Sequence, residues 1–344
     1  MNDVHLVTGG SGYFGSVLAH HLNERGLRTR IFDRFDAPDR PPEVELVLGD
    51  VRDRDAVTAA LADVTVVHHN VAVVPLAKNR AAFWSVNRDG TRVVLEAAAA
   101  AGVRKVVHMS SSAVFGVPES NPVTEEMEPH PGEEYGKAKL AAEELCREAA
   151  AAGLDVTIIR PRTILGPGRL GIMQILFEWV RSGRNVPVLG RGENRYQFVH
   201  ADDLAAACLL AQERPGADLF HIGAERFGTM RETLEALLAH AAAGGRVVGL
   251  PVRLVVPGMK LAGRLGLSPL GDYHALMYHR SLYFDSTRAR DRLGWRARFS
   301  NAEMFCQAYD WYLAHRDEVL ALQEASHHRS AVRQKILRLV SRFL

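Results

Sequence analysis

The sequence has little of three things: cysteine, lysine and long apolar runs. Its three cysteines, Cys146, Cys208 and Cys306, stand far apart in apolar stretches, so we expect reduced thiols and a cytoplasmic protein. No apolar run approaches the ~18 residues that a transmembrane helix needs, and the glycine-rich N-terminal stretch does not resemble a signal peptide. The pattern excludes a disulfide scaffold, and we expect neither secretion nor a membrane span.

An excess of charge of either sign is also missing. Lys and Arg number 42 and Asp and Glu 40, which gives a net charge of +2, and only six of the basic residues are lysines. This balance excludes the strongly basic surface typical of a protein that binds nucleic acid. The fifteen histidines form no HExxH motif and no Cys/His ligand spacing, so we predict no metal site.

The 344 residues, 47% of them hydrophobic, suffice for one large α/β domain or two closely packed domains. In the first 160 residues, short β-branched runs alternate with amphipathic stretches of helical length. Such alternation predicts an α/β fold with a doubly wound parallel sheet. We expect strands at 5–8, 28–33, 44–50, 65–69, 104–111 and 155–161, and helices near 15–25, 53–62, 80–101 and 135–152.

A glycine-rich turn follows the first predicted strand. "VTGGSGYFG" places Gly9, Gly12 and Gly15 before a helix, with Tyr13 and Phe14 between the last two glycines. Glycines there permit a tight turn, close approach of the backbone to a pyrophosphate, and tight packing of helix on strand. The helix N-terminus then faces the phosphates. This context predicts a dinucleotide-binding half of the Rossmann type.

Acidic residues at the ends of the next two strands fit the same ligand. Asp33 lies 18 residues after Gly15, where a carboxylate accepts from both ribose hydroxyls and repels a 2′-phosphate. NAD is therefore favoured over NADP, although Arg34 beside it weakens that preference. Asp50 and Val51, which end the third strand, are expected to bound the adenine ring.

The regular alternation of strand-like and helix-like stretches ends after "GPG" at 166–168. A helix is predicted at 171–182, and "DLFHIGA" is typical of a late strand that returns to the sheet. We therefore expect a smaller C-terminal substrate domain of mixed α/β structure. The predicted division is an NAD-binding domain of 1–165 with 198–222, a substrate domain of 166–197 and 223–315, and a basic amphipathic tail of 316–344.

A candidate acid–base pair lies in "EEYGKAKLAAEEL". Tyr135 and Lys139 share one face of a predicted helix, where an ammonium near a phenol favours the phenolate. Hydride transfer at an alcohol carbon needs a base for the hydroxyl proton, and the lysine would lower the pKa of the tyrosine towards neutrality. Ser111 lies 24 residues earlier, at the end of the fifth strand, and is placed to hold the substrate oxygen. For the pair alone, a surface tyrosine over a lysine stem is the alternative.

Together these motifs resemble those of one family. The chain is similar to the extended short-chain dehydrogenases/reductases, the NAD-dependent epimerase/dehydratase superfamily, over about residues 4 to 300. The resemblance implies a Ser–Tyr–Lys triad at Ser111, Tyr135 and Lys139, with Ser112 as the other candidate serine. The stretches that carry it are "TGGSGYFG", "GDVRD", "SVNRDGT", "SSSAVFG", "YGKAK", "RPRTILGPG", "FVHADD" and "DSTRARDRLGW".

The resemblance also implies supporting positions and partners. Asn87 corresponds to an asparagine that supports the cofactor from below, and Pro161 to a proline near the nicotinamide. Asn70 stands where the family usually has an alanine lining the cofactor cleft, and the sequence does not give its role. The implied cofactor is NAD, with NADP less favoured. Small residues on the Tyr135 helix allow a homodimer through paired helices, and equally allow packing on the sheet.

Two further departures bear on the substrate. Members that act on nucleotide sugars often carry Arg-Asp-Phe where this chain has Tyr196, Gln197 and Phe198, with Arg195 one place early. The same members commonly have an asparagine where Thr163 stands. Both differences weaken the case for a nucleotide-sugar substrate.

The C-terminal part is apolar and basic. Residues 251–270 are mostly apolar, and in 329–344 the basic residues lie mainly off one apolar helical stripe. Such a helix is typical of contact with the inner face of a membrane, or of a tail that packs on the body or on a second subunit. The membrane interpretation suggests a lipid-like substrate, by analogy with the 3β-hydroxysteroid dehydrogenase branch. The stripe consists of Val332, Ile336, Leu339 and Phe343.

Three functions remain open on this evidence. The first is an oxidoreductase that interconverts a secondary alcohol and a ketone on an apolar or lipid-linked substrate. The second is a nucleotide-sugar epimerase or dehydratase, in which tightly held NAD is reduced and reoxidised within one turnover. The third is a non-catalytic NAD-binding regulator, which has no need of an intact Ser–Tyr–Lys set.

Overall fold

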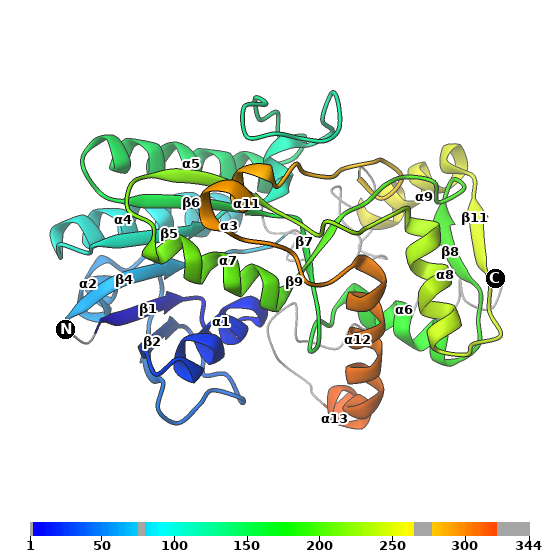
Figure 1. The fold of residues 1–344 in the computed structure, drawn as a ribbon, viewed down its shortest axis with the longest axis horizontal. Coiled ribbons are helices and arrows are strands. Elements are labelled where there is room, and N and C mark those ends of the chain that lie inside the picture. Colours follow the sequence, from blue (N-terminus) through cyan, green and yellow to red (C-terminus); the bar gives the residue numbers. More distant parts are fainter. Residues whose placement is uncertain (1–2, 75–79, 265–276, 322–344) are drawn as a thin grey trace.

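The computed structural model describes residues 3–74, 80–264 and 277–321. Its centre is a seven-stranded sheet with the order β10-β6-β5-β4-β1-β2-β3, in which every neighbouring pair is parallel (Figure 1). The order reverses between β1 and β4, as in a doubly wound sheet. The predicted fold class is confirmed. The strands are β1 (Val4–Thr8), β2 (Arg28–Asp33), β3 (Glu45–Leu48), β4 (Val64–His69), β5 (Lys105–Met109), β6 (Val156–Pro161) and β10 (Asp218–Ile222).

Helices cover both faces of this sheet. One layer contains α1, α7 and α11, and the other α2, α4 and α5 (Figure 1). Because both faces are covered, the central strands β1, β4, β5 and β6 are rich in apolar residues and almost wholly buried. The helices are α1 (Tyr13–Glu24), α2 (Arg54–Ala60), α4 (Thr91–Ala100), α5 (Glu134–Ala151), α7 (Ala201–Glu213) and α11 (Thr287–Leu293).

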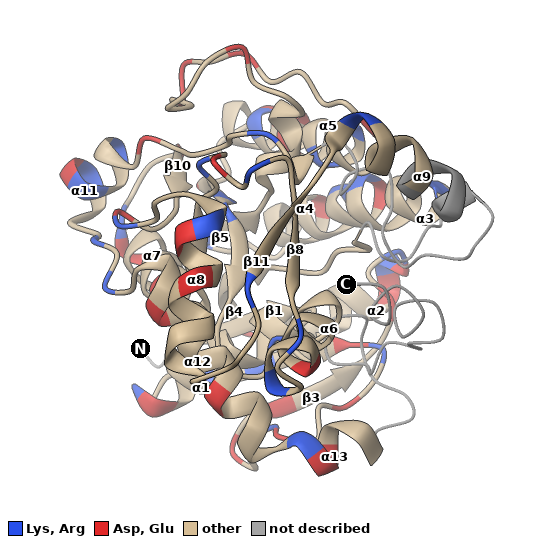
Figure 2. Ribbon diagram, turned by 90° about the vertical axis from the view of Figure 1, so that its right-hand side faces the viewer, with Lys and Arg blue, Asp and Glu red and all other residues tan. Residues whose placement is uncertain are grey.

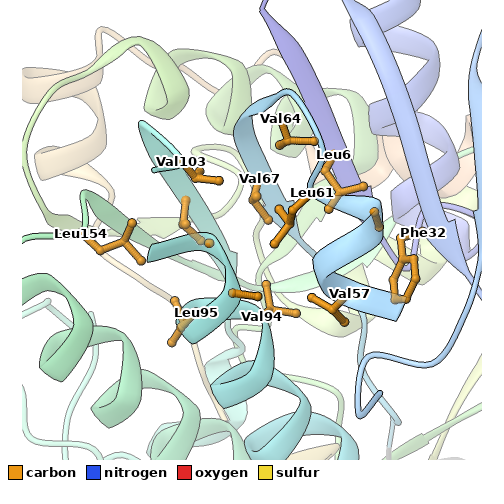
Figure 3. Close-up of a cluster of buried hydrophobic side chains, with 14 of the residues drawn as sticks. Leu6, Phe32, Val57, Leu61, Val64, Val67, Val94, Leu95, Val103 and Leu154 are labelled. Atoms are coloured by element: carbon orange, nitrogen blue, oxygen red, sulfur yellow. The ribbon is translucent and has the colours of Figure 1, made fainter. Parts of the chain in front are cut away.

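The core beneath the layer of α2, α4 and α5 is built from apolar side chains of the sheet and of these helices. Side chains of β1, β2, β4 and β5 point towards α2 and α4 and are buried against them (Figure 3). Burying each valine or leucine there contributes about 1.5–3 kcal/mol relative to leaving it in water. Figure 3 labels Leu6, Phe32, Val57, Leu61, Val64, Val67, Val94, Leu95, Val103 and Leu154.

A smaller unit lies beyond the carboxyl ends of the strands and has its own core. Two short parallel pairs, β7 with β9 and β8 with β11, are surrounded by helices. Figure 2 shows charged residues on α8, α11 and α13, on the outside of the molecule. The elements are β7 (Thr163–Leu165), α6 (Ile172–Arg181), β8 (Val186–Leu189), β9 (Phe198–His200), α8 (Met230–His240), β11 (Val247–Leu250), α9 (Val252–Arg264), α12 (Asn301–Ala314) and α13 (Arg316–Ala321).

Most predicted elements are found within a few residues of their expected bounds, and β10 returns to the sheet as expected. The helix predicted at 80–101 is one difference, because it consists of α3 (Arg80–Trp84), a π-helical turn η2 (Ser85–Gly90) and α4. The predicted C-terminal amphipathic stripe lies outside the described residues. Among those that are described, no helix has the length and apolarity that crossing a bilayer would require.

Histidines lie buried at the centre of the sheet. On β4, His68 contacts Gln212 through Nε2 at 2.8 Å, and His69 lies between the hydroxyls of Thr8 and Thr91 at 2.8 and 2.9 Å. Burial lowers the pKa of both histidines to about 3. They are therefore neutral in the folded protein at physiological pH.

Because the pKa values of His68 and His69 are low in the folded protein, we predict that acid destabilises the fold. Between pH 6.5 and 3 the unfolded chain binds protons at His68 and His69 that the folded chain does not, so the free energy of unfolding falls as the pH falls. Each group contributes up to about 1.4 kcal/mol per pH unit in that window. Urea unfolding followed at neutral pH and at mildly acidic pH measures this slope.

The variant H68Q separates this effect from general acid sensitivity. It should reduce the pH dependence of the urea midpoint, whereas H240Q, which replaces a histidine that is exposed, should leave it unchanged. Equal slopes in all three proteins would contradict the prediction.

Candidate active site

The site lies in a cavity of about 910 Å³ at the carboxyl ends of the sheet strands, where it extends into the smaller unit. Side chains at this edge of a parallel sheet are the usual ligand contacts. One end of the cavity is bounded by the turn after β1 and by the ends of β2 and β3. The other end, which we call the inner chamber, is bounded by α6, β8 and α8 and by the start of α5.

The glycine turn after β1 has the shape predicted for it. Gly9 adopts a φ of +69°, and a Cβ on Gly15 would lie 2.1 Å from the carbonyl oxygen of Gly9. No side chain fits there, so the N-terminus of α1 approaches the strand closely. Gly12, Tyr13 and Phe14 line the cavity beside these glycines. The turn therefore fits a pyrophosphate at the start of α1.

The residues predicted to hold the adenosine lie together at the same end. Asp33 accepts from the backbone N–H of Ser11 at 3.0 Å and of Arg34 at 2.7 Å, and burial raises the pKa of its carboxyl group. Asp50 pairs with Arg52, whose hydrogen bonds lower the pKa of Asp50 to about 2. The predicted residues all line the cavity, and Arg52 lines it beside them. The predicted ones are Asp33, Arg34, Asp50 and the buried Val51.

The N-terminus of α5 is held tightly against the segment after β5. The carboxylate of Glu133 caps the helix by accepting from the N–H groups of Tyr135 and Gly136, both at 2.8 Å. A Cβ on Gly136 would lie 2.4 Å from the carbonyl oxygen of Ala113, so only glycine allows this approach. This packing places Tyr135 beside the residues that follow β5.

Ser111, Tyr135 and Lys139 are brought together at the junction of the cofactor cleft and the inner chamber. Ser111 lies close enough to the side chain of Tyr135 to lower its pKa, and its hydroxyl accepts from Ala113 N–H at 3.1 Å. The Nζ of Lys139 donates to the carbonyl oxygen of Met109 at 2.8 Å. Ser112 instead is buried and accepts from Nη1 of Arg162 at 2.6 Å. The geometry thus favours Ser111 over Ser112 as the serine of the predicted Ser–Tyr–Lys triad.

The electrostatics of Tyr135 differ from the sequence prediction. Burial raises the pKa of Tyr135 to about 12 and lowers the pKa of Lys139 to about 8. The predicted lowering of the tyrosine pKa is wrong for the protein alone, because desolvation outweighs the neighbouring charges. Ser111 and Arg169 oppose the rise, and Glu133 adds to it.

A buried ion pair supports the same helix one turn later. Glu143, fully buried, accepts from Arg160 through both oxygens at 2.8 and 2.6 Å, and also from Ser110 and Arg147. Two-point contact of this kind fixes orientation as well as charge. It ties α5 to β6 and to the end of β5, and so fixes the helical register that Lys139 depends on.

Of the remaining predicted positions, Pro161 and Asn70 line the cavity, whereas Asn87 is buried and does not. Asn87, in the π-helical turn, accepts from Val73 N–H at 2.7 Å and donates to Val73 C=O at 2.9 Å, so it supports the loop after β4. Pro161 lines the cavity at the end of β6. Asn70 lines it too, and its Nδ2 has no partner among the described residues. This donor is available to a bound cofactor.

Two arginines of the inner chamber were missed by the sequence analysis. Arg162 follows β6, and Arg169 lies in the loop before α6. The motif "RPRTILGPG" includes Arg162 and ends one residue before Arg169. The chain folds this loop back over Tyr13, which residue spacing does not reveal.

The sequence of residues 5–223 matches the model of the NAD dependent epimerase/dehydratase family. The chain belongs to this family. Its members are NAD-dependent enzymes, so the predictions of an enzyme and of NAD as its cofactor are confirmed. The glycine turn and the cavity described above fit that cofactor.

Several relatives span nearly the whole chain. The uncharacterized protein y4nG of Sinorhizobium fredii is 50% identical over 97% of this chain and 85% of its own length. A UDP-glucose 4-epimerase of Streptomyces lividans is 28% identical over 92% of this chain and 98% of its own length. Sterol demethylase protein B of Methylococcus capsulatus is 29% identical over 89% of this chain and 97% of its own length. The family thus includes both epimerases and sterol enzymes among this chain's relatives.

A solved structure shows the same fold. The UDP-glucose 4-epimerase of Thermus thermophilus, in complex with NAD, has a TM-score of 0.74 and 25% identity and covers 90% of this chain and 99% of its own.

Asp33 gives a direct test of cofactor choice. In D33N the amide no longer repels a 2′-phosphate and accepts less strongly from the ribose, so NAD affinity should fall and NADP affinity rise. We expect the ratio of the two dissociation constants, measured by fluorescence titration with NADH and NADPH, to change by at least about tenfold. The control D36N alters an exposed carboxylate paired with Arg40 and should leave the ratio unchanged. An unchanged ratio in D33N would rule out the assigned role.

Proposed function

We propose that this enzyme interconverts a secondary alcohol and a ketone on an apolar substrate, with Ser111, Tyr135 and Lys139 as its catalytic residues. The apolar inner chamber beside Tyr135 is the observation that carries the proposal. Bound NAD supplies the hydride acceptor or donor.

The three side chains divide the remaining work. Ser111 donates a hydrogen bond to the substrate oxygen and orients it towards Tyr135. The Tyr135 oxygen removes the hydroxyl proton during oxidation and returns it during reduction. Lys139, held by Met109 one helical turn after Tyr135, is assigned the role of favouring the ionised phenol. In the protein alone, the cation that lowers the pKa of Tyr135 is Arg169. Because burial is the main cause that raises the pKa of Tyr135 to about 12, oxidation depends on such positive charge.

The walls of the inner chamber suit an apolar ligand. Aliphatic and aromatic side chains come from α6, β8, α8, β11 and α9, and the only charged chamber-lining side chains in the described part of the chain are basic. A nucleotide would need hydrogen-bond partners for its base and sugar hydroxyls. The wall residues include Ile172, Met173, Leu176, Trp179, Val188, Leu189, Met230, Leu234, Leu250 and Val255.

The position of Arg195 also argues against a nucleotide-sugar substrate. The family resemblance expects an arginine near here to bind a diphosphate. Instead its guanidinium stacks on the rings of Phe227 and Tyr283, at 4.9 and 4.7 Å from their centroids, and it does not line the cavity. Tyr196 lines the chamber in its place and contacts the hydroxyl of Thr163 at 3.1 Å. Tyr196 and Thr163 therefore stand where nucleotide-sugar members place an arginine and an asparagine, and the arginine of that motif does not reach the chamber.

Nucleotide-sugar epimerisation or dehydration is the alternative function. The observation that favours it is the full-length similarity to the Streptomyces lividans epimerase. It would use the same triad with NAD retained through the turnover.

Membrane contact and a homodimer also stay predictions. On the described part of the chain, Leu254 of α9 is 74% exposed beside the chamber wall. An exposed leucine there would suit contact with a lipid surface.

The substrate class is tested by following NADH. Purified protein is supplied with NAD and either UDP-glucose or a panel of hydroxysteroids and long-chain secondary alcohols. We expect net NADH formation with members of the apolar panel and none with UDP-glucose. Conversion of UDP-glucose into another sugar nucleotide, with no net NADH and no turnover of the panel, would replace this proposal by the alternative.

Tyr135 is tested by the variant Y135F. The ring and its packing on Phe83 are kept, but the proton acceptor is lost, so turnover should fall by about 100-fold or more. NADH affinity should change by less than threefold or so, since no cofactor charge is removed. The control Y283F alters a tyrosine outside the cavity and should retain activity. Activity retained in Y135F would refute the mechanism.

A further inference from the structure

The inner chamber contains positive charge without a matching negative charge. Arg162 and Arg169 both line it, and Arg169 lies close enough to Tyr135 to lower its pKa. The acidic residues that line the cavity, Asp33 and Asp50, belong to the adenosine end. No other described residue with a carboxylate lines it.

Arg169 lies in the wall with its guanidinium over the ring of Tyr13, 5.4 Å from the centroid. It is half-buried, and its electrostatic neighbours are Tyr13, Tyr135 and Tyr278. Within the residues whose side chains are described, no carboxylate pairs with it and no acceptor receives its side-chain N–H groups. Burial lowers the pKa of Arg169 only to about 10, so it stays charged at neutral pH.

Arg162 is the second unbalanced cation. It is 1% exposed, and its Nη1 donates to Ser112 at 2.6 Å. Its Nε and Nη2 are buried without a partner in the described part of the chain. The guanidinium stacks on Tyr196 at 4.7 Å, which fixes it beside the chamber. A buried cation with unsatisfied donors is costly unless a ligand compensates it.

Glu133, a carboxylate that acts on Tyr135, lies outside the lining of the chamber. Its oxygens are occupied by the N–H groups of Tyr135 and Gly136. No carboxylate of the described residues balances this end of the chamber, so an anionic ligand would supply the missing charge. Because the outer walls are apolar, the same ligand must carry an apolar body.

We propose that the substrate is an amphipathic anion, with a carboxylate or phosphate that binds Arg169 and an apolar body that fills the inner chamber. This inference deepens the proposed function and rests on it. Arg169 offers a planar fork that binds such groups through two hydrogen bonds. Arg162 adds long-range attraction from behind Ser112. The pyrophosphate of NAD shares this chemistry, and the test separates the two sources.

The test compares 3-hydroxydodecanoate with its methyl ester. The two share an apolar chain and a hydroxyl group and differ in one charge. Binding to the full-length protein saturated with NADH is measured by calorimetry, since the reduced cofactor prevents oxidation of the probe. We expect the acid to bind about 10- to 100-fold more tightly than the ester.

The variant R169M should remove this difference while leaving ester binding within about threefold. R169K should retain part of it. R195M, which makes the same substitution outside the cavity, should behave as the wild type. R169K also guards against misfolding of R169M, and the melting temperatures of all variants are compared.

Other outcomes overturn the proposal. Equal affinity for acid and ester in the wild type, or no binding of either, removes the anionic substrate. A fall in NADH affinity in R169M with the acid–ester ratio intact assigns Arg169 to the cofactor pyrophosphate instead. Selective binding of the acid without its oxidation by NAD would count against the proposed function alone, because this experiment measures binding and not turnover.

Discussion

The contact between the start of α5 and the segment after β5 is the constraint on which the site depends. Gly136 lies against Ala113 too closely for any side chain, Glu133 caps the helix, and Lys139 is tied to the carbonyl of Met109. The buried pair of Glu143 and Arg160 then fixes the helix one turn further on. Tyr135 is consequently held by backbone contacts and not by its own hydroxyl, which leaves that hydroxyl to Ser111 and the ligand.

Much of this arrangement could be predicted from local sequence rules. Strand–helix alternation gives the parallel sheet, because strands covered on both faces are rich in β-branched apolar residues. The glycine turn and Asp33 follow from the space and charge that a dinucleotide requires. The helical spacing of Tyr135 and Lys139 places both on one face, and the position of Ser111 at a strand end brings it to the same edge.

Other features depend on tertiary contacts that spacing does not encode. The π-helical turn around Asn87 reflects a two-point contact with Val73, on a different segment of the chain. The raised pKa of Tyr135 is a property of burial, whereas the sequence shows only the neighbouring lysine. Arg169 faces the chamber because its loop folds back over Tyr13, although 156 positions separate the two residues.

The separate cores of the two units have a consequence for divergence. The sheet is stabilised by its own apolar clusters, and the walls of the inner chamber draw on a third one built from α6, β8, α8 and α12. Mutations that reshape the chamber therefore leave the packing beneath the cofactor largely untouched. An ancestral chain with this architecture can exchange one substrate for another by gradual change, without passing through intermediates that fail to fold.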